Sequence, residues 1–266
     1  MRMRYAVSSM VFWWRENNLS LEQECEFLRS LGFGIELWPY IRGQQECRCE
    51  RNNWPRLVEA TEGMLVSLRS RDHGPSIEQW EEQIECARLL NASIVTDLKS
   101  LGIRGVTEVN GSGFAADVVS MAESYKVKLC VETGSLPAVR QLGKKFDSLW
   151  YCLDTGYANL DMEFGFKRYV DELAERVVHL HLSDNYGLSD DHETPGLRGG
   201  IENRNWDYLL SALDKYDRDI IAVFEMCPSA PAVMIRQASE FLFNHLRWPG
   251  RPQKQAGYTN VIHNSV

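Results

Sequence analysis

The sequence predicts a single (β/α)8 barrel, an α/β fold in which eight parallel strands close on themselves beneath a layer of helices. A short apolar run, a polar loop and an amphipathic segment recur eight times along the 266 residues. No Gly-, Pro- or Ser-rich linker and no break in composition divides the chain. No G-x-G-x-x-G follows the first strand, so the alternative fold, an open doubly wound sheet, lacks its usual dinucleotide signature.

The apolar runs predict the strands and the amphipathic segments predict the helices. The expected strands are Tyr5–Ser8, Ile35–Trp38, Met64–Leu68, Ser93–Thr96, Lys128–Glu132, Leu149–Asp154, Val177–His181 and Ile220–Glu225. The expected helices are Leu21–Leu31, Trp54–Glu62, Ile77–Leu90, Phe114–Tyr125, Leu136–Leu142, Tyr169–Arg176, Trp206–Tyr216 and Ala232–Leu246. Ser20 and Ser76 are suitable N-caps for the first and third helices, and Gly32 closes the first.

We expect residues 1–248 to form the barrel domain. The tail, residues 249–266, is polar and has no apolar periodicity, so we expect it to be extended or disordered.

Composition narrows the class of protein. Hydrophobic residues make up 44% of the chain, which is enough for a sizeable core, and charged residues make up 25%. The net charge of −8 argues against broad binding to a phosphate backbone, so nucleic acid is an unlikely partner. The sequence is compatible with a homo-oligomer.

Cysteine usage and the apolar runs indicate a cytoplasmic protein. The seven cysteines are odd in number and scattered, which fits reduced thiols. The segment MRMRYAVSSMVFWW has no continuous apolar h-region with a small-residue cleavage site, so it does not read as a signal peptide. No run of about 18 apolar residues predicts a membrane span.

Four consecutive strands end on groups that bind metals. In barrels of this kind the active site lies at the carboxyl ends of the strands. Strands five to eight end on Glu132, Asp154, His181 and Glu225. A single carboxylate at a strand end often caps the next helix, but three packed together would repel one another unless a cation neutralised them. We therefore predict one divalent ion: Mn²⁺, Mg²⁺ or Co²⁺, with Zn²⁺ also compatible with the imidazole.

The seventh strand carries two histidines. His179 and His181 are two residues apart, so their side chains point to the same side of the strand. His179 lies one pleat deeper than His181. We interpret it as packed in the core or behind the ligands rather than as a ligand.

Short motifs in the chain resemble one family of barrels. HLHLSDN at residues 179–185, DTGYAN at 154–159, GIELWP at 34–39 and the late glycines resemble the xylose isomerase-like TIM barrels. This family includes sugar and sugar-phosphate isomerases and epimerases, and the endonuclease IV-type DNA repair enzymes. The resemblance covers roughly residues 5–246 and implies metal binding by Glu132, Asp154, His181 and Glu225. In the epimerase branch the two glutamates also transfer protons across the substrate carbon.

The resemblance implies a metal-dependent isomerase or epimerase acting on a small sugar or a related hydroxy-carbonyl compound. Glu132 and Glu225 are then the catalytic pair: one removes the proton α to the carbonyl and the other returns it, through an enediolate. Three alternatives stay open. They are a dehydratase of a sugar acid or inosose, an abasic-site endonuclease of the endonuclease IV type, and a non-catalytic barrel that binds a metabolite.

The chain departs from the family pattern at positions that separate these alternatives. Tyr157 stands three residues after Asp154, where the family usually has histidine. The fourth strand ends in Thr96 to Lys99, where a nuclease has histidine, although His73, Asp190 and His192 could answer to three further nuclease ligands. The nuclease is therefore the less favoured hypothesis.

Five further residues are candidates for contact with a small sugar-like substrate: Glu36, Trp38, Lys99, Asp184 and Arg198. Glu36 could accept a hydroxyl hydrogen bond or cap a helix. Lys99 could polarise a carbonyl or be a solvated surface lysine. Arg198 lies in the glycine-rich loop after strand seven, where barrel enzymes often bind phosphate, although a surface arginine fits equally. Trp38 could join Phe12, Trp13 and Trp14 in an apolar wall against a sugar ring.

Overall fold

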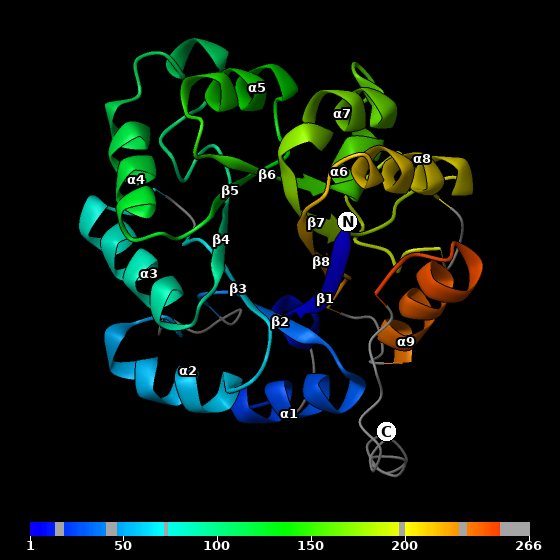
Figure 1. The fold of residues 1–266 in the computed structure, drawn as a ribbon, viewed down its shortest axis with the longest axis horizontal. Helices are drawn as coiled ribbons and strands as arrows, with labels where there is room; N and C mark the ends of the chain where they lie inside the picture. The colour runs from blue at the N-terminus through cyan, green and yellow to red at the C-terminus, as the bar shows by residue number, and fades with distance from the viewer. Residues whose placement is uncertain (14–18, 41–46, 72–73, 197–199, 229–232, 251–266) are drawn as a thin grey trace.

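The computed structural model describes residues 1–13, 19–40, 47–71, 74–196, 200–228 and 233–250. Its strands form a closed parallel barrel in which each strand pairs with the next along the chain. The last strand closes the ring on the first, with Tyr5 opposite Ala222 and Val7 opposite Phe224 (Figure 1). The single (β/α)8 barrel that the sequence predicts is confirmed, and an open doubly wound sheet is excluded.

All eight predicted strands are present, with small shifts at their ends. They are β1 (Arg2–Ser8), β2 (Gly34–Leu37), β3 (Val66–Arg69), β4 (Ser93–Thr96), β5 (Leu129–Glu132), β6 (Trp150–Asp154), β7 (Val177–Leu182) and β8 (Asp219–Phe224). The α-helices are α1 (Leu21–Leu31), α2 (Trp54–Thr61), α3 (Ile77–Leu89), α4 (Gly113–Ser124), α5 (Leu136–Lys145), α6 (Thr155–Leu160), α7 (Gly165–Leu173), α8 (Asn203–Asp214) and α9 (Val233–Glu240).

Local sequence signals account for several helix ends. Ser20 and Ser76 each form a capping box with the glutamine three residues later, so they begin α1 and α3 as predicted. Gly32 ends α1 with a φ of 79°, in the left-handed region that glycine enters without strain. Two differences from prediction are the short helix α6, which follows β6 directly, and the last helix, which ends at Glu240 and continues as a π-helical turn.

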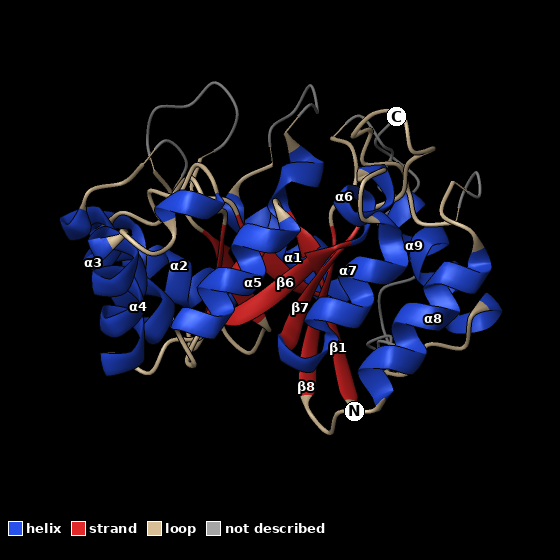
Figure 2. Cartoon of the chain, turned by 90° about the horizontal axis from the view of Figure 1, so that it is seen from above, coloured by secondary structure: helices blue, strands red, loops and turns tan. Residues whose placement is uncertain are grey.

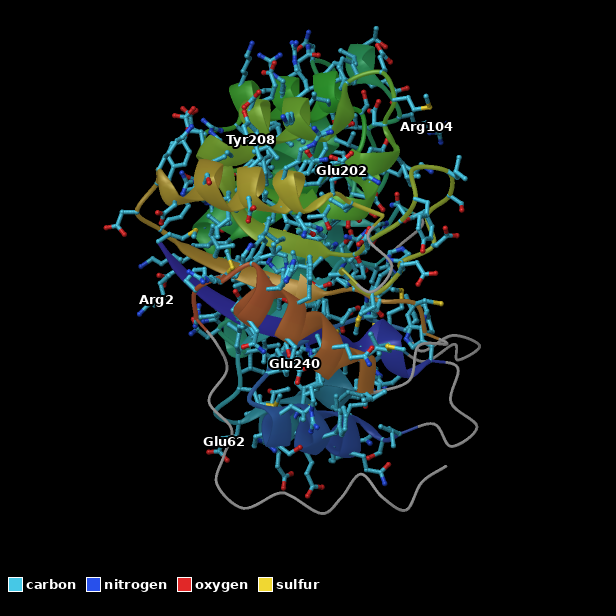
Figure 3. The ribbon with its side chains drawn as sticks, turned by 90° about the vertical axis from the view of Figure 1, so that its right-hand side faces the viewer. Arg2, Glu62, Arg104, Glu202, Tyr208 and Glu240 are labelled. Carbon is cyan, nitrogen blue, oxygen red and sulfur yellow. The ribbon has the colours of Figure 1, made fainter. Side chains whose placement is uncertain are left out.

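The helices surround the barrel and bury their apolar faces against it (Figure 2). Trp80, Tyr169 and Trp206 are fully buried between the strands and this outer layer. Charged side chains such as Glu62 and Arg104 lie at the outside of the molecule (Figure 3). Within the described ranges, no helix is both long enough and apolar enough to cross a bilayer.

The chain returns to the start of the barrel after the last helix. Tyr5 donates its hydroxyl hydrogen bond to the carbonyl oxygen of Pro249, at 2.7 Å. Gly250 lies so close to Met3 that an added Cβ would be 2.3 Å from the Met3 carbonyl oxygen. The domain boundary at residue 248 stays a prediction, and residues 251–266 of the predicted tail lie outside the described residues.

All seven cysteines are described, and none forms a disulfide. The cytoplasmic location inferred from cysteine usage stays a prediction.

Candidate metal centre

The four strand-end residues predicted to bind a metal meet at one place. Glu132, Asp154, His181 and Glu225, hereafter the metal quartet, each offer a ligand atom within 4.8 Å of those of the other three. Glu132 and Asp154 are the last residues of β5 and β6, His181 is the last but one of β7, and Glu225 directly follows β8. Adjacent parallel strands therefore bring together residues that are up to 93 positions apart, from 132 to 225.

Asp154 is fixed by its neighbours in two ways. Its backbone N–H donates to the hydroxyl of Thr133 at 3.0 Å, and its Oδ1 accepts from the backbone N–H of Tyr157 at 3.0 Å. Asp154 is thus the N-cap of α6 as well as a member of the metal quartet, so the two readings of this carboxylate are compatible. Ser183 also donates to Oδ1, at 3.3 Å, and Gly156 leaves the room for it: a Cβ there would lie 2.4 Å from the Ser183 hydroxyl.

The two ring nitrogens of His181 face different partners. Nδ1 lies 2.5 Å from Oε1 of Glu132 and 2.9 Å from Oε2 of Glu225, inside the metal quartet. Nε2 points the other way and lies 3.1 Å from Oε1 of Glu36. Metal-binding histidines commonly donate their second ring N–H to a carboxylate, which fixes the tautomer and the ring orientation. Nε2 of His181 has such a carboxylate partner in Glu36, so Nδ1 would be the ligand atom if a metal is bound.

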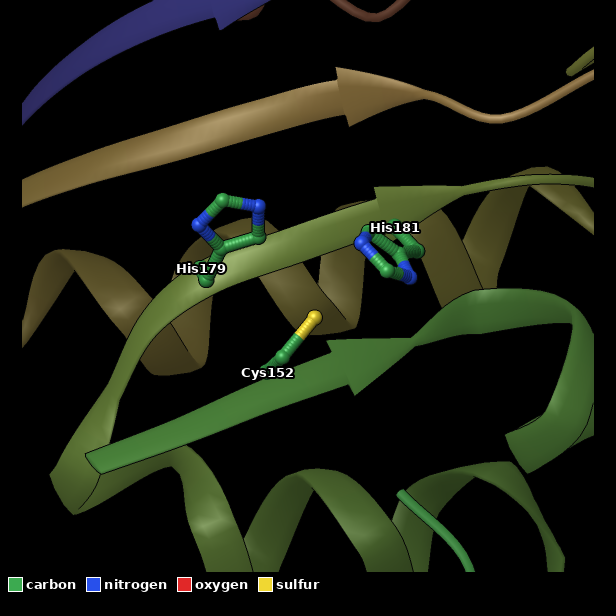
Figure 4. A group of neighbouring side chains, drawn as sticks. All are labelled: Cys152, His179 and His181. Carbon is green, nitrogen blue, oxygen red and sulfur yellow. The ribbon is translucent and has the colours of Figure 1, made fainter. Parts of the chain in front are cut away.

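Glu36 lies beneath the metal quartet, inside the barrel. Its carboxylate accepts from Ser67 at 3.1 Å and lies 3.0 Å from Nε2 of His179, as well as against His181. Both imidazoles project from the same face of β7, and the sulfur of Cys152 points toward them from β6 (Figure 4). Glu36 has no exposed surface and lies within β2, and it caps none of the described helices; its contact with a substrate stays a prediction. His179 is buried, as expected, but with Cys152 and His181 it forms a second group of possible ligand atoms, so its interpretation as a non-ligand stays a prediction.

Arg69 belongs to the site although sequence reasoning did not select it. Its Nη2 donates to Oε2 of Glu132 at 2.5 Å, and its guanidinium carbon lies 5.3 Å from the centre of the Trp38 ring. The strand-end argument that found the metal quartet would have found Arg69 too. The predicted third strand stopped at Leu68, one residue short of the observed end.

Electrostatics of the metal quartet favour a bound cation. Burial, together with the charges of Glu132 and Glu225, raises the pKa of Asp154 to about 7. Burial alone would also raise the pKa of Glu132, but the positive charges of Arg69 and His181 outweigh it and hold that pKa at about 2. A divalent ion would neutralise the carboxylates and keep all three ionised.

The donor set itself fits such an ion. Three carboxylates and one imidazole within a single ligand sphere suit Mn²⁺, Mg²⁺ or Co²⁺, and the imidazole leaves Zn²⁺ compatible. The identity of the metal stays a prediction.

The other candidate substrate residues lie in different settings. Asp184 is 2% exposed and accepts from the backbone N–H groups of Asn185, Gly196 and Ile201, so its carboxylate organises the loop after β7; its contact with a substrate stays a prediction. Lys99 is exposed on the loop after β4. Arg198 falls outside the described residues.

Two of the four aromatic residues considered for a wall against a sugar ring pack against each other, and the contact with a sugar stays a prediction. Trp13 and Trp38 pack edge to face, with ring centres 5.1 Å apart. Phe12 is buried, at 2% exposure, and Trp14 lies outside the described residues.

Two of the residues that suggested a nuclease lie beside the metal quartet. His192 places Nδ1 3.1 Å from the carbonyl oxygen of Glu225 and Nε2 3.4 Å from Asp190. Its φ of 47° is unusual for a residue with a side chain. Among the described residues, neither Asp190 nor His192 belongs to a group whose ligand atoms are close enough to hold one metal ion, and His73 lies outside the described residues. Tyr157 is 37% exposed at the rim.

The fold and this site define a (β/α)8 barrel with a carboxylate–histidine cluster at the carboxyl ends of its strands. The model of the xylose isomerase-like TIM barrel family matches residues 48–245, and the chain belongs to that family. No curated protein matches the chain.

Solved structures resemble this one over most of its length. A D-tagatose 3-epimerase-like protein is 20% identical, with a TM-score of 0.72, over 92% of this chain and 97% of its own. D-psicose 3-epimerase from Clostridium cellulolyticum H10 is 15% identical, with a TM-score of 0.64, over 92% and 98%. A sugar phosphate isomerase/epimerase from Parabacteroides distasonis is 11% identical, with a TM-score of 0.66, over 90% and 93%. At these identities the likeness establishes the fold.

Proposed function

We propose that this protein is a divalent-metal-dependent epimerase or isomerase of a small sugar or a related hydroxy-carbonyl compound. One observation carries the proposal. Glu132 at the end of β5 and Glu225 just after β8 lie 2.5 and 2.9 Å from Nδ1 of His181, so two carboxylates flank the imidazole that we propose as a metal ligand. Family membership supports it, as does the fold shared with the D-tagatose 3-epimerase-like protein and D-psicose 3-epimerase.

The proposed chemistry is a proton transfer at the carbon next to a carbonyl group. One glutamate takes the proton, and the electron pair of the broken C–H bond moves toward the carbonyl oxygen to give an enediolate. A bound divalent ion would supply the positive charge that stabilises the two oxygens of this enediolate. Return of a proton to the opposite face by the second glutamate gives the epimer, whereas return to the adjacent carbon gives the isomer.

Arg69, Ser183 and Glu36 set the positions of the groups that perform these steps. Arg69 donates to Oε2 of Glu132, and Oε1 of the same carboxylate lies 2.5 Å from Nδ1 of His181. Ser183 contacts Asp154, and Glu36 contacts His181. Arg69 thus orients one of the two proposed proton-transfer groups, and Ser183 and Glu36 orient two of the proposed metal ligands, which lowers the cost of reaching the reactive geometry.

The test is hydrogen exchange with the solvent. Mn²⁺-loaded protein should be incubated in D2O with a panel of ketoses, aldoses and their phosphates. A true substrate should acquire deuterium next to its carbonyl group, or pass hydrogen between adjacent carbons.

Glu132→Gln and Glu225→Gln should each reduce turnover by about 10²–10⁴-fold with metal retained, because the amide cannot shuttle a proton. Glu62→Gln, an exposed glutamate, is the control. Near-normal turnover in either site variant would refute the two-glutamate mechanism.

The nuclease alternative makes a different prediction for the same protein. Asp190 and His192 border the metal quartet, but Tyr157 stands where a further histidine ligand would be needed. We expect one tightly bound metal ion and no cleavage of abasic DNA. Three tightly bound zinc ions with cleavage would favour the nuclease, and a site that stays empty in excess metal would favour a non-catalytic binding barrel.

A further inference from the structure

We propose that Arg69 and the neighbouring face of Trp38 form a subsite for an oxyanion, a carboxylate or a phosphate carried by the substrate. The inference rests on the proposed function for the reaction itself. It adds the class of substrate: a hydroxy-carbonyl compound whose negative charge lies close to the reacting carbon.

The first observation is the pairing of the Arg69 guanidinium. Its side chain is 9% exposed, and one of its three nitrogens, Nη2, donates to Glu132. The other two, Nε and Nη1, have no hydrogen-bond partner among the described residues. Leaving buried N–H donors unpaired is costly, and buried polar groups in native proteins nearly always have partners. The contact with Glu132 therefore pairs only one of the three guanidinium nitrogens.

A second arginine of the same chain shows what a purely structural pair looks like. The side chain of Arg48 is 10% exposed and its partner Glu24 is 3% exposed, so this pair is as buried as that of Arg69. Arg48 places Nη1 and Nη2 on the two oxygens of Glu24, at 2.7 and 2.9 Å. Arg69 makes a single contact of this kind, at the edge of the candidate active site.

Besides Glu132 and the other nearby carboxylates, Arg69 lies against a pair of tryptophans that pack on each other. The Trp38 ring lies 5.3 Å below the guanidinium carbon, and Trp38 is held in place by a hydrogen bond from Nε1 to the Ser8 hydroxyl at 2.8 Å. Trp13 packs against Trp38, and its Nε1 also lacks a partner among the described residues. Because the unpaired groups are all donors, the complementary ligand group must be an acceptor.

The chemistry of arginine selects the kind of acceptor. The guanidinium stays charged in proteins, and its planar fork of N–H groups matches the geometry of carboxylates and phosphates. Because Nη2 contacts Glu132, an oxyanion on the remaining nitrogens would lie near the carbon from which Glu132 exchanges a proton. A short hydroxy-keto acid or a short sugar phosphate fits this placement better than a charge at the far end of a long sugar.

Three matched probes test the subsite by binding alone: D-glycerate, glycerol and glycerol 3-phosphate, which share a three-carbon backbone and differ in one terminal group. Their affinities should be measured by titration calorimetry on the full chain, in Mn²⁺-loaded and metal-free forms. We expect at least one anionic probe to bind about ten-fold or more tightly than glycerol in both forms. The metal-free form excludes chelation of the ion by glycerate as the cause. The tighter of the two anions identifies carboxylate or phosphate as the group that the subsite receives.

Variants then assign the preference to Arg69. Arg69→Met should lower the affinity for that anion by about ten-fold or more and change the affinity for glycerol little, whereas Arg69→Lys should retain part of the preference. Arg48→Met removes a buried ion pair elsewhere and should leave the ratio unchanged. Metal content and melting temperature should be recorded for each variant. If Arg69→Met does not fold, Arg69→Lys decides, because loss of the paired guanidinium fork should still weaken anion binding measurably.

Two results would overturn the subsite: equal binding of all three probes by the wild type, or an unchanged preference in the Arg69 variants. Neither depends on turnover. An Arg69-dependent preference without hydrogen exchange would support the oxyanion subsite and refute the proposed epimerase activity. Hydrogen exchange without this preference would support the activity and refute the subsite.

Discussion

Glu36 and His181 lie against each other in the interior of the barrel, with Oε1 of the glutamate 3.1 Å from Nε2 of the imidazole, and neither side chain is exposed. The contact crosses the barrel from β2 to β7 and joins residues 145 positions apart. It leaves Nδ1 of His181 turned toward Glu132 and Glu225. The orientation of the proposed metal ligand is therefore set by a carboxylate that cannot itself touch the solvent.

This contact predicts the effect of changing Glu36. Glu36→Gln keeps the size of the side chain but removes the charge that orients and polarises the imidazole. We expect Mn²⁺ affinity to fall by about 10–100-fold, measured by competition with a chelator. Ser67→Ala, which removes only the hydroxyl that donates to Glu36, should have a smaller effect. Wild-type affinity in Glu36→Gln would show that the contact does not support metal binding.

Metal binding should also depend on pH through Asp154. Burial and the neighbouring glutamates raise the pKa of Asp154 from 3.8 to about 7, so the folded metal-free protein retains a proton that the unfolded chain has lost. The stability that this proton contributes is fully present below about pH 4 and is lost as the pH rises through 7. A metal must displace this proton and also one on His181, because burial alone would lower the pKa of the imidazole but the charged neighbours Glu225 and Glu36 raise it well above 6.5. Metal affinity should therefore fall by about ten-fold or more for each pH unit below 7.

The measurement is Mn²⁺ affinity between pH 5 and pH 8, together with melting temperatures of the metal-free protein. Asp154→Asn cannot titrate, so the melting temperature of the metal-free wild type should fall relative to that of this variant as the pH rises. Mn²⁺ affinity of the wild type that does not change below pH 7 would contradict the assignment.

The space beside Gly156 predicts a third result. A methyl group there would meet the hydroxyl of Ser183 at 2.4 Å and would lie 3.4 Å from Oδ1 of Asp154. Gly156→Ala should therefore displace Ser183, weaken metal binding and lower stability by about 1–3 kcal/mol, as overpacking of a tight site does. Gly105→Ala meets nothing within 4 Å and is the matched control. Equal melting temperatures and metal affinities for the two variants would show that the site accommodates the methyl group without loss of stability or metal binding.

The sequence predicts the metal quartet because each of its members is at or next to the end of an apolar run, where a one-dimensional pattern is informative. Asp154 illustrates the limit of the argument, since it caps α6 as well as joining the metal quartet. The pattern predicts that Glu36 contacts a substrate, because it places this residue near a strand end. Its contact with His179 and His181 depends on two strands that face each other across the closed barrel. The pattern of apolar residues along the sequence does not predict which side chains meet across the barrel. Arg69 was missed by a shift of a single residue at the end of β3.

The central claim is that Glu132, Asp154, His181 and Glu225 hold one divalent ion. Its most direct test is a crystal structure of the protein grown with Mn²⁺, with data collected at the manganese absorption edge. The account predicts one anomalous peak at this position, about 2.0–2.6 Å from a carboxylate oxygen of each acidic residue and from Nδ1 of His181. A fully occupied ion held elsewhere, or by other residues, with these four side chains uncoordinated would contradict it.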